Sequence, residues 1–146
     1  MRRLAVRAAA ALATVAVLAA GAFWFREVFT EYRSDSANWS ASVTTIEVDA
    51  AAGVQVAVER IDGGGDQSAS DVQWQTHSIL GRAEVTDTES GRLSARCHTP
   101  TPLSRCAIWL TVRTTTPRTR VVIVQHPGAT IADTDRRVPV EIRQAP

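Results

Sequence analysis

From Val43 onward, apolar residues recur at every second position, and this alternation limits the fold more than any other feature of the chain. A spacing of two places successive side chains on opposite faces of an extended strand, so one face can be buried while the other meets water. The pattern is clearest over residues 46–49, 54–58 and 72–75. No helical spacing follows residue 43, so we expect an all-β domain.

Turn-forming residues divide this pattern into about eight short strands. Further strands are expected over residues 93–97, 107–114, 120–125 and 138–142. Aromatic residues make up only 5% of the chain, so valine and isoleucine must supply most of the core. The sequence therefore predicts a small β domain over residues 43–146, arranged as a truncated β-solenoid or as a sandwich-like stack.

The chain begins with Arg2, Arg3 and Arg7, followed by an uncharged stretch over residues 8–25. In a helix these eighteen residues would reach roughly 27 Å, close to the thickness of a hydrocarbon core. The positive-inside rule would hold the arginines in the cytoplasm. We therefore expect a cytoplasmic tail over residues 1–7, a transmembrane helix over residues 8–26, and an extracytoplasmic remainder.

Half of the uncharged stretch is alanine, so a few large side chains must supply its affinity for lipid. These predicted anchor residues are Leu12, Val15, Val17, Leu18, Phe23, Trp24 and Phe25. A cleaved secretory signal is the main alternative, because the small residues 20–22 resemble a cleavage site. A buried soluble helix is the third possibility. Both the anchor and the signal would export the residues that follow.

A polar stalk is predicted over residues 27–42. Val28, Phe29 and Tyr32 recur at helical spacing, so the helix is expected to continue for one or two turns. Trp39, later in the same segment, is expected to cover the first strand of the β domain.

The two cysteines, Cys97 and Cys106, fall on the apolar faces of their strands. Cys97 shares a face with Leu93, and Cys106 shares one with Ile108. An antiparallel hairpin could set the two opposite each other, at a separation that a disulfide accepts. Outside the cytoplasm such a bond persists, and a loop of this length stabilises by roughly 2–3 kcal/mol.

The sequence contains no recognisable catalytic or metal-binding motif. No serine lies in a Gly-x-Ser-x-Gly elbow, and His77, His98 and His126 stand alone in the sequence. The spacing of the two cysteines matches no short-spaced zinc-ligand pair, even with His98 between them. Residues 62–66 are typical of a flexible loop rather than a calcium site. We expect no catalytic residues, cofactor or metal ion, and no enzyme activity.

Charge is divided unevenly along the chain. Residues 27–91 hold 3 arginines and 12 acids, whereas residues 92–146 hold 9 arginines and 3 acids. The two halves are expected to neutralise each other by packing. An arginine-bearing face for an anionic polymer or lipid head groups is the alternative. Nucleic acid is not an expected partner, because no aromatic residues are interleaved with the arginines.

Several short motifs follow one another in a recognisable order: Ile46-Glu47-Val48, Val72-Gln73-Trp74, Gly91-Arg92-Leu93, Cys106-Ala107-Ile108, Thr116-Pro117 and Pro127-Gly128-Ala129. The layout resembles bacterial membrane-anchored, adhesin-like β-solenoid domains of unknown function. In that family a leading anchor precedes repeated β rungs. Because the glycine-marked rungs stop after about one, this chain would be a short, divergent member. The resemblance implies an adhesion or envelope-sensing role without catalytic residues.

The sequence thus predicts a single-pass, membrane-anchored extracytoplasmic β domain with a non-catalytic envelope interaction or structural role. Its expected partners are the lipid bilayer and an envelope protein or anionic polymer. Two alternatives stay open: an accessory subunit of a membrane complex, and a secreted domain released by cleavage of the N-terminal segment.

Overall fold

The computed structural model describes residues 2–40, 42–62, 70–115 and 118–146, with the side chains of residues 2–11 and 26–28 outside the description. The chain divides into two units, one ending at Thr30 and one beginning at Glu31. Each unit is described by itself.

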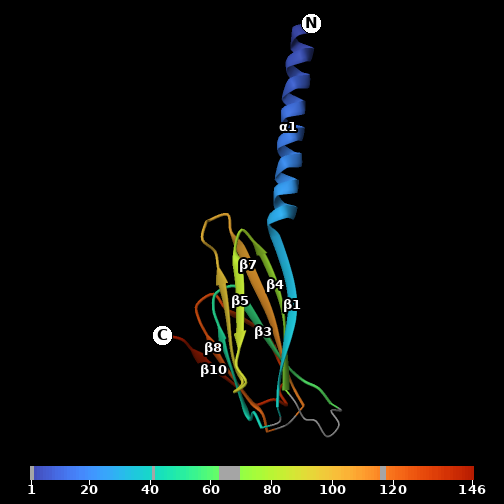
Figure 1. The fold of residues 1–146 in the computed structure, drawn as a ribbon. Helices are drawn as coiled ribbons and strands as arrows, with labels where there is room; N and C mark the ends of the chain where they lie inside the picture. The colour runs from blue at the N-terminus through green and yellow to red at the C-terminus, as the bar shows by residue number, and fades with distance from the viewer. Residues whose placement is uncertain (1, 41, 63–69, 116–117) are drawn as a thin grey trace. The chain divides into compact units, whose positions relative to one another are not determined.

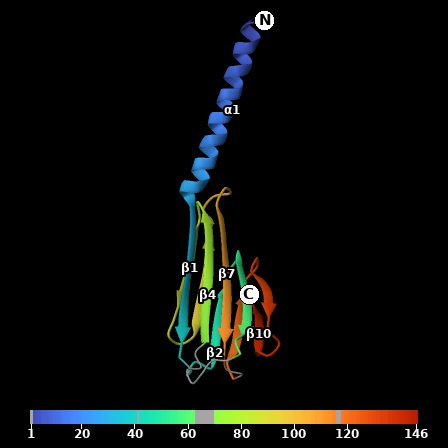
Figure 2. The same cartoon turned by 90° about the vertical axis from the view of Figure 1, so that its right-hand side faces the viewer.

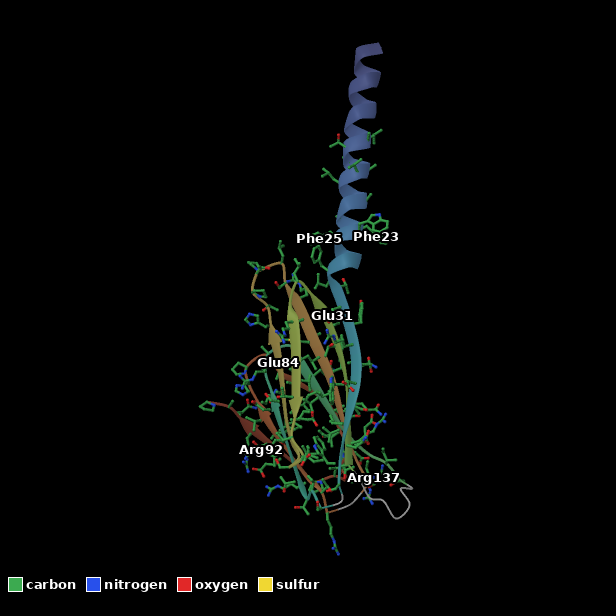
Figure 3. The ribbon with its side chains drawn as sticks, viewed as in Figure 1. Phe23, Phe25, Glu31, Glu84, Arg92 and Arg137 are labelled. Carbon is green, nitrogen blue, oxygen red and sulfur yellow. A yellow bond between two sulfur atoms is a disulfide. The ribbon has the colours of Figure 1, made fainter. Side chains whose placement is uncertain are left out.

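The first unit is the single helix α1 (Arg2–Phe29), shown in blue in Figure 1. Its many alanines have the strongest intrinsic preference for helix, which accounts for its regularity. All seven predicted anchor residues are exposed on it: Leu12, Val15, Val17, Leu18, Phe23, Trp24 and Phe25. Phe23 and Phe25 are labelled in Figure 3, and the ring of Phe25 lies 4.4 Å from that of Phe29.

A helix forms where the sequence predicts one, but its assignment as a transmembrane segment over residues 8–26 is not supported. Within the described residues, no helix combines the length and the apolar character that crossing a membrane requires. The side chains of Arg2, Arg3 and Arg7, predicted to set the topology, lie outside the described part.

The predicted stalk over residues 27–42 instead contributes a strand, β1 (Thr30–Trp39). The helix ends at Phe29, so it continues for about one turn beyond residue 26 and does not reach Tyr32. Trp39 is buried in the core of the β domain, and its indole Nε1 donates a hydrogen bond to the carbonyl of Thr88 over 2.9 Å. Burial of this large side chain holds the segment against the β domain, which explains why the segment forms a strand of the domain rather than a separate stalk.

The second unit is all β, as predicted, and consists of two five-stranded sheets (Figures 1 and 2). The first sheet has the order β1-β4-β7-β3-β9, and the second has the order β10-β8-β2-β6-β5. After β1 the strands are β2 (Thr45–Ala50), β3 (Val54–Arg60), β4 (Ser70–Ile79), β5 (Arg82–Asp87), β6 (Arg92–His98), β7 (Arg105–Thr114), β8 (Arg120–Gln125), β9 (Thr130–Thr134) and β10 (Val140–Gln144).

Both sheets are mixed. In the second sheet β2 runs parallel to β6 on one side and to β8 on the other, while in the first sheet β3 runs parallel to β7 and β9. The pairs β4–β7 and β5–β6 are antiparallel. Three strand–turn–strand units, β8–β9, β2–β3 and β6–β7, therefore pass from the second sheet to the first and stack on one another.

The turns of these units also stack, and Gly53 lies at their centre. Its N–H donates to the carbonyl of Gly128 over 3.1 Å, and its own carbonyl accepts from the N–H of Ile108 over 3.0 Å. Gly53 has a φ of +82°, and a Cβ atom there would lie 3.0 Å from the carbonyl oxygen of Cys106. Only glycine combines this backbone conformation with so close an approach.

The core lies between the inner faces of the two sheets. Alternate residues of the strands point into it, as the sequence pattern predicts, and most are valine, isoleucine or leucine. Its fully buried larger side chains are Ile46, Val48, Val54, Val56, Val58, Val72, Leu93, Ile108, Leu110, Val112, Val121 and Ile123.

The predicted disulfide between Cys97 and Cys106 is confirmed, with Cα atoms 5.6 Å apart. The predicted hairpin around it is wrong, because β6 belongs to the second sheet and β7 to the first. The bond therefore links the two sheets across the turn rather than two paired strands. Residue parity places both cysteines on the core side whether their strands form a hairpin or belong to opposite sheets. Parity alone could therefore not distinguish these two arrangements.

Ion pairs join the acidic first half of the chain to the arginine-rich second half, as the packing interpretation predicts. Asp49 lies 3.4 Å from Arg96, Glu59 lies 3.7 Å from Arg113, and Asp62 lies 2.5 Å from Arg137. Arg137 also donates hydrogen bonds to Asp135, and these lower the pKa of that carboxyl below its ordinary value. Most of these pairs are exposed, so each contributes little to stability.

Removal of the disulfide should weaken the fold. The double variant Cys97→Ser/Cys106→Ser is expected to lose about 2–3 kcal/mol of unfolding free energy, because its unfolded chain regains the entropy of the open loop. Urea unfolding of the full chain measures the change. Reductant should destabilise the parent protein to a similar extent and leave the double variant unaffected. Equal stability of parent and variant without reductant would contradict this role.

Asp71 should make stability depend on pH. Burial raises the pKa of its carboxyl above the ordinary value, although the charge of Arg113 acts in the opposite direction. The ionised carboxylate is thus disfavoured in the folded state, and stability falls as pH rises through the raised pKa. The change in Tm caused by Asp71→Asn should be more positive at pH 7 than at pH 3. The exposed Asp87→Asn is the control, and a pH-independent effect of Asp71→Asn would refute the prediction.

Candidate functional site

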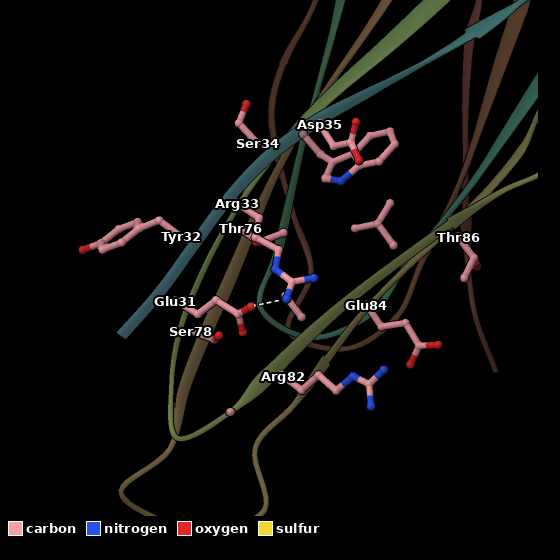
Figure 4. Close-up of a pocket in the computed structure, with 14 residues that line it drawn as sticks. Glu31, Tyr32, Arg33, Ser34, Asp35, Thr76, Ser78, Arg82, Glu84 and Thr86 are labelled. Carbon is pink, nitrogen blue, oxygen red and sulfur yellow. Dashed lines mark ion pairs between the residues drawn. The ribbon is translucent and has the colours of Figure 1, made fainter. Parts of the chain in front are cut away.

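An open groove of about 910 Å³ lies between β1 and β5, the strands at one end of each sheet. Figure 4 shows its walls and labels most of the residues that line it. β1 contributes residues 31–35, β5 and the residue before it contribute residues 81–86, and β4 contributes Trp74, Thr76 and Ser78. All of these residues belong to the second unit.

The groove exists because the two sheets end differently. The first sheet continues past β4 to β1, whereas the second ends at β5. Among the described strands, none lies opposite the inner face of β1. Residues 31–36 are accordingly exposed on both faces of the strand, although only one face of an edge strand in a two-layer stack is normally open.

The inner face of β1 carries charged side chains. In Figure 4 Arg33 and Asp35 point toward the groove, whereas Tyr32 points away from it. Glu31 forms an ion pair with Arg33 on this side. Arg82 and Glu84 border the groove on the opposite wall, although their side chains point away from β1 in Figure 4. Inward-pointing charges on an edge strand oppose unspecific pairing with other chains. They leave the groove open to a partner that can match them.

The floor of the groove is formed by β4 and is less polar. Trp74 is only 9% exposed and belongs to the core, while the hydroxyls of Thr76 and Ser78 follow on the same face and are buried. The inner face of β4 thus changes from apolar at Val72 to hydroxyl-bearing at Ser78. An indole and two hydroxyl groups give a bound chain both an apolar surface and hydrogen-bonding partners.

The backbone of β5 adds further hydrogen-bonding groups. The N–H of Thr88 donates to the carbonyl of Arg92 over 2.9 Å, which fixes the phase of the antiparallel ladder between β5 and β6. In such a ladder alternate residues face the partner strand and the others face away. Ala83 and Val85 therefore direct their N–H and C=O groups to the outer edge, where the described part of the second sheet has no further strand.

None of the three histidines is among the described residues that line this groove. His77 stacks against Tyr32 on the outer face of the first sheet, and His126 Nε2 lies 2.7 Å from Asp49 Oδ1. His126 and His98 line a smaller cavity, of about 460 Å³, together with Arg96. None of the described residues lining that cavity has a hydroxyl, and Cys97 is held in the disulfide. The His126–Asp49 pair thus has no nucleophile beside it within the described lining.

Metal-ligating side chains do not gather at one place in the part of the chain that the structure describes. No group of three or more histidine, cysteine or acidic residues could hold an ion there. The zinc arrangement considered from the sequence needs two free thiolates, and both sulfurs are joined in the disulfide.

The sequence analysis missed the groove because both of its walls lie in segments not expected to be strands. Residues 31–35 were assigned to the stalk, and residues 82–87 were not assigned to a strand. A signal was nevertheless present: Glu31, Arg33 and Asp35 recur at every second position. This is the strand period with charge in place of apolar side chains.

Comparison with solved structures finds a "putative cell adhesion protein" from Clostridium sporogenes, with 5% sequence identity and a TM-score of 0.38. The alignment covers 78% of this chain and 57% of that one, so this chain spans little more than half the length of the structure it matches. At this score the likeness supports no argument. No protein-family profile matches the chain, and no curated protein sequence matches it. The family resemblance therefore stays a prediction.

Truncation of a side chain in the floor of the groove should lower the unfolding free energy much more than truncation of a side chain in its β1 wall. Trp74→Ala is expected to cost roughly 3–5 kcal/mol of unfolding free energy, since it opens a cavity in the core. Arg33→Ala should change it by less than about 0.5 kcal/mol, because its ion pair with Glu31 is exposed. Urea unfolding of both variants tests the contrast. A large loss with Arg33→Ala would mean that the β1 wall is a structural support rather than an open surface.

Proposed function

We propose that this chain is a non-catalytic interaction domain that acts outside the cytoplasm and binds an extended segment of an envelope protein in the groove between β1 and β5. The observation that carries this proposal is the outer edge of β5, whose unpaired backbone groups face a groove with no described strand in it. Strand addition to such an edge is a recurrent mode of peptide recognition.

The geometry of the groove suits an added strand. A segment hydrogen-bonded to Ala83 and Val85 would extend the second sheet and lie opposite β1, which none of the described strands faces. Its alternate side chains would meet the indole of Trp74 and the hydroxyls of β4. Main-chain hydrogen bonds would supply affinity, and the charges of Arg82, Glu84 and Asp35 would select the sequence of the partner.

An extracytoplasmic location is supported by two features. The arginines before residue 8 and the uncharged stretch after them are typical of segments that direct a chain across a membrane. The disulfide is of a kind that persists in oxidising compartments. On this proposal the N-terminal segment delivers the domain to the outer side of the membrane. It is either retained there or removed by cleavage.

We also propose that the stacked units β8–β9, β2–β3 and β6–β7 form a truncated solenoid. The parallel, in-register pairing of β2 with β6 and β8 supports this arrangement. β4 and β5 would then close one end of the stack, since both run antiparallel to the last unit. Terminal capping units of solenoids carry a polar outer face that keeps the protein soluble.

Export is tested in the native host. Thiol labelling of protein taken directly from cells should find Cys97 and Cys106 oxidised. Of two reporters fused after Pro146, the one that works only outside the cytoplasm should be active, and the one that works only in the cytoplasm should be inactive. Release of the fusion into the medium would identify the secreted alternative. Reduced cysteines together with an active cytoplasmic reporter would refute the proposed location.

Groove binding is tested by photocrosslinking in the same host. A benzophenone side chain at Glu84 should crosslink to an envelope protein, whereas one at the distant Gln144 should not. Val85→Pro should abolish the crosslink, because it removes an outward N–H while leaving the β5–β6 ladder in place. Crosslinking that persists in Val85→Pro, or that occurs equally at both positions, would exclude strand addition at β5. A crosslink to a polytopic protein would identify the accessory-subunit alternative.

A further inference from the structure

We propose that the outer face of the first sheet binds a neutral polysaccharide. This inference goes beyond the proposed function, because it concerns a different surface and a different class of ligand. The surface consists of Tyr32, Gln55, Gln73, Gln75, Trp109 and Thr111, and is called the aromatic–amide face below.

The strand register places these side chains together. Gln75 of β4 is paired with Trp109 of β7, and Trp109 is paired in turn with Gln55 of β3. Residues paired directly across neighbouring strands lie on the same side of the sheet. Gln73 and Thr111 form the next pair along β4 and β7, so amide and hydroxyl groups surround the indole on both sides.

Two aromatic rings are offered to solvent on this face. Trp109 is 43% exposed and Tyr32 is 70% exposed, although tryptophan is highly buried on average in folded proteins. The phenol ring of Tyr32 stacks on the imidazole of His77, with centroids 4.4 Å apart and planes within 3°. Figure 4 shows Tyr32 directed away from the groove. The stacking partner holds the ring as a fixed, flat surface.

A shallow depression of about 330 Å³ lies between the two rings and is lined by Tyr32, Ser34, Gln75 and Trp109, among others. A pyranose ring presents C–H groups on its faces and hydroxyls at its rim. The C–H face can stack on the negative face of an aromatic ring, and the hydroxyls can pair with amide groups. Two rings separated by an amide-lined depression match consecutive sugars of a chain.

The charge distribution argues for a neutral ligand. Charged residues make up 21% of the chain. On the outer face of the first sheet, Arg105 and Arg113 both belong to β7. The described outer-face positions that lie between them on β7, and those paired with these on β4 and β3, include no arginine and no acidic residue. At one end Arg113 is neutralised by Glu59 and Asp71. Arg33 also lines the depression, but its guanidinium is paired with Glu31. A polyanion would need free arginines here, and they are lacking among these described positions.

A protein partner fits this face less well. The centres of protein interfaces are more apolar than the rest of the surface and are enriched in aromatic residues, methionine and arginine. Here the aromatic rings are separated by glutamines, which would each need a hydrogen-bonding partner when covered. Sugar hydroxyls supply such partners at every residue of a polysaccharide.

Affinity electrophoresis of the full chain, kept in a zwitterionic detergent without sugar groups, tests the proposal. Gels contain a soluble β-glucan, an α-mannan or an arabinogalactan, and retardation gives the dissociation constant. At least one should retard the parent protein, and both Trp109→Ala and Tyr32→Ala should weaken this binding roughly tenfold or more. Trp109→Phe, which keeps an aromatic ring, should retain most of it.

The controls separate this surface from the groove and from anion binding. Ile142→Ala removes an exposed apolar side chain from the second sheet and should leave retardation unchanged, as should the groove variant Val85→Pro. Raising NaCl from low to high concentration should have little effect, since no ion pairs are involved. The proposal is overturned if none of the three polysaccharides retards the parent protein, if Trp109→Ala binds as tightly as the parent, or if salt abolishes the retardation.

Discussion

The close approach of neighbouring turns at Gly53 is the constraint on which the two-sheet arrangement depends. At this residue the chain passes from the second sheet to the first, and its backbone hydrogen-bonds to Gly128 in the neighbouring turn and to Ile108 of β7. Because these turns are in register, the strands that leave them are also in register and parallel. The valine and isoleucine side chains of three successive units can then pack against one another between the sheets.

This arrangement explains which parts of the fold were predictable. Alternation along a single strand is a local property, so the inward faces of β2, β3 and β7 followed directly from the sequence. Pairing is not local. The same parity that places Cys97 and Cys106 toward the core suits a hairpin as well as two strands in opposite sheets. The disulfide could therefore be predicted while its structural context could not.

The edges of the sheets were the hardest parts to predict, and they form the candidate site. β1 and β5 lack the apolar alternation of the other strands, because part of each faces a groove rather than a covered core. Charged side chains at every second position are as regular as apolar ones but are commonly attributed to loops. The groove residues Glu31, Arg33 and Glu84 thus lie in segments that hydrophobic patterning alone passes over.

The covalent continuity between α1 and β1 has a mechanical consequence. The helix ends at Phe29 and the edge strand begins at Thr30, with no linker between them. Any pulling force applied through the helix would be transmitted first to the hydrogen bonds that hold β1 to β4. The indole of Trp39, buried at the other end of the strand, would then resist complete detachment. Tension would therefore load the outermost strand before it reaches the disulfide-linked layers behind it.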